Sequence, residues 1–460
     1  MQNCSVYCIY GDLFVTLRAK YTVYMHNKHI IILTLVTTLS LTGCNTKPTG
    51  STQECIASAG QVLVCNNTQQ HSSTPVRTGI ETLKSLNFAP LEGKRVGLCT
   101  NPTGVDLQMR STIDILWEAE NVNLVALYGP EHGVRGNVHA GDHVGNEVDA
   151  RTGLRMYSLF GATRKPTKEM MDEIDIMVYD IQDIGCRSFT YISTMGMLME
   201  ACAEYDKELL VLDRPNPLGG RKIEGNIVED GYVSFVSQFP IPYIYAQTPG
   251  ELALYLNAQA EKPCRLTIAP MQGWTRDMTW DKTGLEWIVA SPHIPQGKTA
   301  LFYPVTGIFG EFGYLNIGVG YTLPFELMGA PWINADSLAQ AMNALQLPGL
   351  YFRPIYYKPY YSVFQGEQIQ GVQIHIMDYD KAHLSDVQFL IVQELMRMYP
   401  DKDWFTLCNQ SRFSMFDKVC GTNKIRELFG QRYRWDDAKD YWYKDVESYR
   451  QESSKYYLYD

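Results

Sequence analysis

A glutamate and a histidine stand side by side in the segment Gly-Pro-Glu-His-Gly at residues 129–133, directly after an apolar run. Glutamate has no special turn chemistry, so Glu131 between a proline and a His-Gly pair is a candidate for a direct chemical role. His132 beside it is a second candidate catalytic residue. The alternative is an ordinary loop, because glycine and proline are common in turns.

Three more apolar runs end in polar segments, namely Asn-Pro-Thr-Gly at 101–104, Asp-Ile-Gln-Asp-Ile-Gly at 180–185 and Asp-Arg-Pro-Asn-Pro at 213–217. In open α/β sheets ligands bind beyond the carboxyl ends of the strands, so we predict that these segments and Glu131 share one rim. The candidate residues that they add are Asn101, Asp180, Gln182, Asp183, Arg187, Asp213, Arg214 and Asn216.

Two carboxylates across a small pocket are what glycosidic cleavage requires, one to donate a proton and one to support the cationic centre or activate water. Glu131 with Asp180, Asp183 or Asp213 could supply them. The 8 Trp, 30 Tyr and 17 Phe offer faces for sugar stacking, although most should belong to the core. A metal site is a weaker alternative, because carboxylates beside arginines more often form hydrogen-bonded networks. Its ligands would be Glu131, His132, Asp180 and Asp213.

Composition and motifs argue against several other functions. The net charge is -10 and there is no Lys/Arg-rich run, so nucleic acid is not an expected partner. Neither GxGxxG nor GxxxxGK[ST] occurs where a nucleotide site needs it, and there is no GxSxG elbow. No CxxC pair or Cys/His spacing suggests zinc, so we expect no metal.

The elements that must position these residues begin near residue 78. With 460 residues, 45% of them apolar, the chain should hold two domains. Short apolar runs alternate with helical stretches, which predicts a parallel sheet covered on both faces, a Rossmann-like α/β domain over residues 78–295. The expected strands are 95–100, 122–128, 174–179, 209–212 and 266–269, and the expected helices are 111–119, 194–205 and 249–258.

The pattern changes after residue 295 to segments rich in glycine and aromatic residues. We predict a smaller α+β domain over residues 296–460. Its expected strands are 351–361 and 372–377, and its expected helices are 336–345 and 385–398.

The amino terminus carries a candidate export signal. Basic Lys28 precedes an apolar run at 30–41, which is too short to span about 30 Å of hydrocarbon. Small residues then lead to Cys44. This order resembles a bacterial lipobox, which implies cleavage before Cys44, acylation of its sulfur and lipid anchoring in the cell envelope, at the periplasm or outer membrane. Residues 25–43 would be the signal peptide.

Two flanking segments complete this prediction. Residues 1–24 lie ahead of Met25 and are expected to be an extension from a misplaced start codon. Residues 44–77 are rich in Thr, Ser, Asn and Gln and are expected to be a tether. Within the tether, Cys55 and Cys65 could pair in an oxidising compartment. By contrast, Cys99, Cys186 and Cys202 sit in apolar runs and are expected to be core thiols.

From about residue 78 to 460 the chain resembles the NamZ-type exo-β-N-acetylmuramidases. The resemblance rests on long motifs around the four polar segments, at 97–106, 127–136, 180–187 and 213–220. It implies a Rossmann-like catalytic domain, a smaller carboxyl domain, no cofactor, and release of N-acetylmuramic acid from the non-reducing ends of peptidoglycan fragments. It also implies that Glu131 is the general acid and that the other candidate residues line the cleft.

The resemblance adds one binding residue and one departure. Glu311 keeps its place before the Pro-Phe-Glu segment, but Ile317 and Val319 stand where many members carry charged residues. An arginine suits the lactyl carboxylate of muramic acid, because its fork accepts a carboxylate bidentately. The alternatives left open are a non-catalytic lipoprotein that binds peptidoglycan sugars and, more weakly, a metal-dependent hydrolase.

Overall fold

The computed structural model describes residues 4–10, 13–19, 24–26, 29–31, 58–63, 75–136 and 147–460, and the chain divides into two compact units, residues 1–48 and 49–460. The first unit contains two antiparallel hairpins. Their strands are β1 (Cys4–Tyr10) with β2 (Leu13–Ala19) and β3 (Tyr24–His26) with β4 (His29–Ile31). Cys44, Cys55 and Cys65 lie outside the described residues, so the predicted anchor and disulfide remain predictions.

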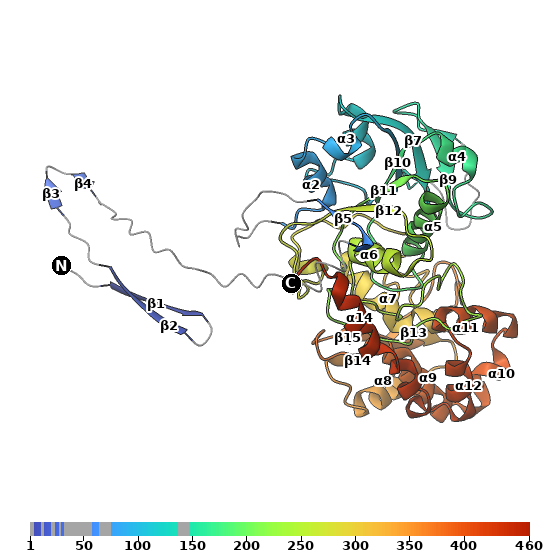
Figure 1. The fold of residues 1–460 in the computed structure, drawn as a ribbon. Helices are drawn as coiled ribbons and strands as arrows, with labels where there is room; N and C mark the ends of the chain where they lie inside the picture. The colour runs from blue at the N-terminus through green and yellow to red at the C-terminus, as the bar shows by residue number, and fades with distance from the viewer. Residues whose placement is uncertain are drawn as a thin grey trace. The chain divides into compact units, whose positions relative to one another are not determined.

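The second unit is built on an eight-stranded sheet with the order β5-β12-β11-β10-β6-β7-β9-β8 (Figure 1). Seven strands run parallel and β8 pairs antiparallel with β9. This confirms the predicted α/β fold. The strands are β5 (Gln61–Val62), β6 (Arg95–Thr100), β7 (Asn123–Gly129), β8 (Glu147–Val148), β9 (Arg155–Ser158), β10 (Ile176–Asp180), β11 (Glu208–Leu212) and β12 (Arg265–Ala269).

Helices cover both faces of this sheet because side chains of a strand alternate between its faces. On β10, Met177 packs in a core with α5 and α6, whereas Val178 packs in another core with α2 and α3. A capping box between Thr248 and Glu251 starts α6. The helices are α2 (Gly79–Ser85), α3 (Thr112–Glu118), α4 (Lys168–Asp172), α5 (Tyr191–Glu204) and α6 (Pro249–Gln259).

The rest of the second unit is a mixed α+β region, as predicted. A three-stranded antiparallel sheet has the order β13-β15-β14. An aromatic core holds the helices together, with Phe389 stacked on Trp435 at 4.2 Å between ring centroids. The elements are α7 (Gly297–Gly310), β13 (Leu327–Ala330), α8 (Ala335–Ala344), β14 (Leu350–Tyr357), β15 (Ile369–Ile376), α9 (Asp386–Met398), α10 (Trp404–Leu407), α11 (Phe413–Cys420), α12 (Lys424–Arg432), α13 (Lys439–Tyr443) and α14 (Val446–Ser453).

A short strand lies within the described part of the expected tether. Gln61 and Val62, expected in a polar tether, form β5 and pair with β12 at the edge of the sheet. Ala59 next to them is buried in the core with α5 and α6. Two residues of strand are too short for a periodic signal, and polar residues surround them in the sequence.

The sheet order brings the polar segments together. From β6 the chain continues through β7 to β9 on one side, and from β10 it continues through β11 to β12 on the other. The strand order therefore reverses between β6 and β10, which is where open α/β sheets form a crevice. The loops after β6, β7, β10 and β11 all leave this edge. Among the helices that the structure describes, none is long and apolar enough to cross a membrane.

Candidate active site

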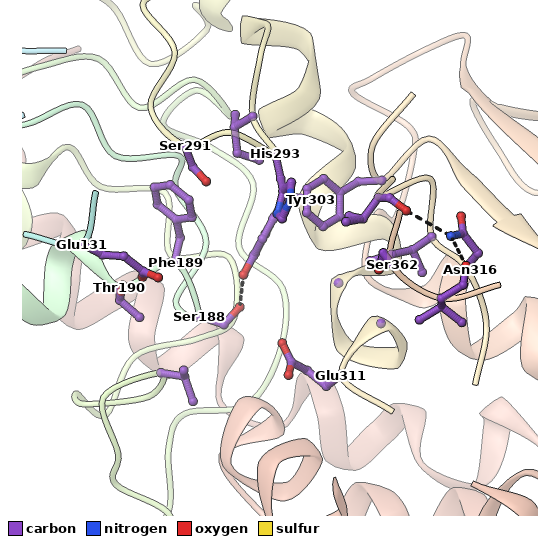
Figure 2. Close-up of a pocket in the computed structure, with 18 of the residues that line it drawn as sticks. Glu131, Ser188, Phe189, Thr190, Ser291, His293, Tyr303, Glu311, Asn316 and Ser362 are labelled. Atoms are coloured by element: carbon purple, nitrogen blue, oxygen red, sulfur yellow. Dashed lines mark hydrogen bonds between the residues drawn. The ribbon is translucent and has the colours of Figure 1, made fainter. Parts of the chain in front are cut away.

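A cavity of about 380 Å³ lies between the loops of the sheet edge and the carboxyl end of α7 (Figure 2). One wall comes from the turn after β7 and the segment after β10, and the other comes from α7, the loop that follows it and residues 362–363. Residues of both predicted domains therefore line this cavity. The polar side chains that line it are Glu131, His132, Ser188, Thr190, Tyr191, Ser291, His293, Tyr303, Glu311, Asn316 and Ser362.

Glu131 is presented by a tight turn at the end of β7. The backbone N–H of Gly133 donates to the carbonyl of Pro130 at 3.0 Å, which closes a four-residue turn. His132, the third residue of this turn, has a φ of +74°, a left-handed angle that glycine or asparagine usually takes there. Such an angle costs a histidine about 1–3 kcal/mol, and strain of this kind clusters at functional sites.

The half-buried Glu131 carboxyl is suited to hold a proton. Burial raises the pKa of Glu131, and the positive charge of Arg164 lowers it in part. Arg164 is itself exposed and lies over the Phe235 ring. A carboxyl with a raised pKa is what a general acid needs near neutral pH.

A second carboxyl faces the same cavity from the other wall. Glu311 follows the last residue of α7, and burial raises the pKa of Glu311 while Arg412 lowers it in part. Burial raises the pKa of the Tyr303 hydroxyl, and the negative charges of Glu311 and Glu131 raise it further. The Ser188 hydroxyl donates to the Tyr303 hydroxyl at 3.3 Å, and Figure 2 shows this pair between Glu131 and Glu311.

An imidazole pair forms another part of the wall. His132 and His293 both line the cavity. Burial lowers the pKa of His293, and the neighbouring His132 lowers it further, so His293 stays neutral at the pH where a free histidine begins to gain a proton. Neutral imidazoles can donate and accept hydrogen bonds to sugar hydroxyls.

The structure places Asp180 away from this cavity. Its carboxylate is fully buried and accepts hydrogen bonds from Arg214, at 3.0 Å from Nη2, and from the hydroxyl of Thr112. Arg214 also donates to the carbonyl of Val105. Both residues are therefore engaged with each other. The geometry favours a structural role for them rather than the catalytic and binding roles predicted from the sequence.

Asp213 is also occupied by protein donors. Its carboxylate accepts from the hydroxyls of Thr248, at 2.8 Å, and Tyr459, at 2.5 Å, and from the backbone N–H of Gly250 at 2.7 Å. Burial raises the pKa of Asp213 to about 7. The carboxylate joins the end of β11 to α6 and to the end of the chain, which again favours a structural role.

Asn101 and Asp183 are buried near Tyr191, which lines the cavity. Burial raises the pKa of the Tyr191 hydroxyl, and the side chain of Asn101 beside it lowers that pKa. Asp183 accepts from the backbone N–H of Gly185 at 2.7 Å and from the Tyr245 hydroxyl, and burial raises the pKa of Asp183 to about 6. These residues support the wall that Tyr191 presents.

The three remaining predicted binding residues are buried and engaged by the backbone. Arg187 donates to the carbonyls of Asn226, Ile241 and Val419. The amide of Gln182 donates to the carbonyls of Asp183 and Pro215, and Gln182 borders a different cavity. Asn216 donates to the carbonyl of Gln247 and accepts from the backbone N–H of Leu218. None of the three is among the residues described as lining the cavity.

Sequence reasoning assigned Glu311 to binding and missed four residues that shape the site. None of the four belongs to a sequence motif, and two of them, Arg164 and Arg412, are exposed arginines in segments remote from the strand ends. They are Arg164, His293, Tyr303 and Arg412. Among the residues that the structure describes, no three His, Cys, Asp or Glu side chains are grouped so that they could hold a metal ion.

Comparison with models of protein families shows which family the chain belongs to. The model of the amino-terminal domain of the exo-β-N-acetylmuramidase NamZ matches residues 96–298, and the model of its carboxyl-terminal domain matches residues 301–459. The chain belongs to the NamZ family. It is 41% identical over 384 residues to the peptidoglycan β-N-acetylmuramidase NamZ of Bacillus subtilis (strain 168), covering 84% of this chain and 91% of the relative.

Two solved structures share the NamZ fold of this chain, and both are of DUF1343 family proteins from Bacteroides fragilis NCTC 9343. The first is 61% identical with a TM-score of 0.82, and the second is 29% identical with a TM-score of 0.65. Each match covers 84% of this chain and 99% of the other chain. The departure noted in the sequence falls within the site, because Ile317 and Val319 both line the cavity. They make this part of its wall apolar.

Proposed function

We propose that this protein is an exo-acting β-N-acetylmuramidase that releases N-acetylmuramic acid from the non-reducing ends of peptidoglycan fragments during cell-wall turnover. The observation that carries the proposal is the pair of half-buried carboxyls, Glu131 and Glu311, in one cavity of a chain that is 41% identical to a peptidoglycan β-N-acetylmuramidase. A pair of carboxyl groups is the usual equipment for cleaving a glycosidic bond.

In this proposal Glu131 donates its proton to the oxygen of the leaving sugar. Glu311, whose carboxyl faces the cavity from the opposite wall, supports the cationic anomeric centre or activates the attacking water. The bond between the anomeric carbon and the leaving oxygen breaks, and water supplies the new hydroxyl. Tyr303 and Ser188, hydrogen-bonded between the two carboxyls, position the ring by contacts to its hydroxyls.

The lactyl carboxylate of muramic acid needs a cationic partner. Arg187 and Arg214, the arginines suggested by the sequence, are committed to backbone carbonyls and to Asp180. Arg164 and Arg412 are exposed, and the charge of each reaches a carboxyl of the cavity. We therefore assign the lactyl carboxylate to one of these two arginines.

The test is hydrolysis of a chromogenic N-acetylmuramic acid glycoside by the wild-type protein and by Glu131→Gln. The proposal expects release by the wild type and a loss in the variant. Binding of muropeptides with no hydrolysis, unchanged by Glu131→Gln, would instead favour a non-catalytic glycan-binding protein, for which the apolar wall at Ile317 and Val319 is the motivating observation. Activity that exhaustive chelation abolishes would favour the metal-dependent alternative.

We also propose that the protein is exported and anchored in the cell envelope by a lipid on Cys44. The support is the order of basic residues, apolar run and small residues before this cysteine. Radiolabelled palmitate should enter the wild-type protein in cells and should not enter Cys44→Ser. Equal labelling of both proteins, or of neither, would contradict the anchor.

A further inference from the structure

Beyond the catalytic cavity, the carboxyl-terminal half exposes a group of tyrosines. Tyr356, Tyr360 and Tyr361 are 53%, 71% and 50% exposed. All three lie within six residues of one another, at the end of β14 or just after it. Single exposed aromatic residues are ordinary on a protein surface, but a local group of them marks a binding surface.

Tyr356 and Tyr360 border a groove of about 500 Å³, which we call the tyrosine groove. Polar side chains stand between the rings and can hydrogen-bond to hydroxyl and acetamido groups, while Lys358 can pair with a carboxylate. The residues that line the tyrosine groove are Tyr321, Tyr356, Tyr357, Lys358, Pro359, Tyr360, Gln365, Gly366 and Gln368.

The backbone and ring contacts hold the tyrosine groove in shape. The N–H of Tyr360 donates to the carbonyl of Gly320 at 2.7 Å, and the N–H of Gly366 donates to the carbonyl of Pro359 at 2.9 Å. The Tyr360 ring lies nearly parallel to the Tyr321 ring, at 15° and 6.1 Å between centroids. One face of Tyr360 is therefore supported by protein while the ring stays largely exposed, as a preorganised stacking surface requires.

One segment of the chain links the tyrosine groove to the catalytic cavity. The Tyr361 ring stacks on the His293 imidazole at 23° and 6.1 Å between centroids, and His293 lines the cavity. The next two residues, Ser362 and Val363, line it as well. Figure 2 shows His293 and Ser362 at the wall of the cavity. Residues 356–363 thus lead from the groove to the place where the terminal sugar is expected.

We propose that the tyrosine groove binds the saccharide units on the reducing-end side of the cleaved bond, so that the enzyme prefers glycan chains to short fragments. The proposal rests on the proposed function, because an exo-acting enzyme takes only the terminal unit into the cavity and the rest of the chain must leave through its mouth. The apolar faces of these units stack on the tyrosine rings, and Lys358 pairs with the carboxylate of a muramic acid unit.

The experiment compares Tyr360→Ala with the wild type on three substrates: the chromogenic N-acetylmuramic acid glycoside, a disaccharide and a tetrasaccharide of peptidoglycan. We expect kcat/KM for the tetrasaccharide to fall about tenfold, as for the loss of one supported ring contact, with no change for the chromogenic glycoside. Tyr360→Phe should retain the preference because it keeps the ring. Tyr351→Ala is the matched control, since Tyr351 is 52% exposed on β14, the strand that precedes Tyr360, but lies beside His375.

A parallel binding measurement separates this proposal from the proposed function. Calorimetry with Glu131→Gln protein should show that adding Tyr360→Ala weakens the tetrasaccharide about tenfold and leaves N-acetylmuramic acid unchanged. Wild-type protein that hydrolyses no substrate would overturn the muramidase function, while the binding difference would still report on the groove. An equal effect of Tyr360→Ala on all substrate lengths, or no effect on any, would overturn the groove proposal.

Discussion

The hydroxyl of Tyr459 donates to the carboxylate of Asp213 at 2.5 Å, although the two residues are 246 positions apart. The same carboxylate accepts from Thr248 and from the N–H of Gly250. The last residues of the chain are thereby fixed to the carboxyl end of β11. A carboxylate at a strand end, in a segment typical of catalytic sites, thus stabilises the fold.

The burial of Asp213 predicts a dependence of stability on pH. Burial raises the pKa of Asp213 to about 7, whereas an unfolded aspartate has a pKa of about 3.9. The folded protein keeps a proton that the unfolded chain releases between about pH 4 and pH 7, so the contribution is fully present below about pH 4 and is lost as the pH rises to about 7. The loss is at most about 1.4 kcal/mol per pH unit.

Urea unfolding at about pH 5 and about pH 7 measures this effect. Asp213→Asn should remove the Asp213 part of the slope, whatever its effect on overall stability. Asp230→Asn, at an exposed position, is the control and should leave the slope unchanged. An unchanged slope in Asp213→Asn would contradict the assignment.

Glu131→Gln should lower kcat on a natural disaccharide by about 10²- to 10⁴-fold, because the glutamine cannot donate a proton to the leaving sugar. On a nitrophenyl glycoside the loss should be smaller, since this leaving group departs without a proton. Steady-state kinetics on both substrates give the comparison, and Glu92→Gln at an exposed position is the control. Equal losses on the two substrates would assign another role to Glu131.

Arg164→Gln should move the alkaline limb of the kcat/KM profile to higher pH. The positive charge of Arg164 lowers the pKa of Glu131, so its removal lets the acid keep its proton to higher pH. Arg164→Lys should preserve the profile because it keeps the charge. A profile that is the same in Arg164→Gln and the wild type would show that Glu131 does not set this limb.

Arg412→Gln should move the acidic limb of the same profile to higher pH. Arg412 lowers the pKa of Glu311, and without it the carboxylate that must be ionised takes up a proton at higher pH. If Arg412 also holds the lactyl carboxylate, KM should rise for the N-acetylmuramic acid glycoside and not for the N-acetylglucosamine glycoside. A rise in Arg164→Gln alone would assign that contact to Arg164.

His132→Ala should be less stable than His132→Gly by about 1 kcal/mol, because position 132 has a left-handed φ of +74° that glycine adopts without strain. Both variants lose the imidazole, so the comparison isolates the backbone. Chemical unfolding measures the difference. At Glu92, where φ is -60°, alanine should be the more stable of the two.

The sequence predicts the architecture well because its signals are local. All five residues of β10 are buried and the first four are apolar, and the turn that carries Glu131 follows a strand that is also largely buried and apolar. β5 and α7 were not predicted. β5 is very short, and the largely buried α7 has Pro304 within it, which obscures a helical pattern.

The site was predicted only in part, because a polar residue at a strand end can turn inward or into the cleft. Asp180 and Arg214 turn inward and pair with each other, whereas Glu131 lies in the cavity wall. The sequence pattern is the same in these cases. Glu311 faces the same cavity as Glu131 only because the two halves of the chain pack together, and that packing depends on contacts distant in sequence.

The buried guanidinium of Arg187 has a consequence for how substrate reaches the cavity. Arg187 follows β10 in the segment that forms one wall of the cavity. Its guanidinium donates to the carbonyl of Val419 in α11 at 2.8 Å. Separating the two halves would take this acceptor away from a charged donor, at a cost of about 1–3 kcal/mol. Hinge motion between the halves is therefore opposed. Sugar should therefore enter and leave the cavity mainly while the two halves are packed together.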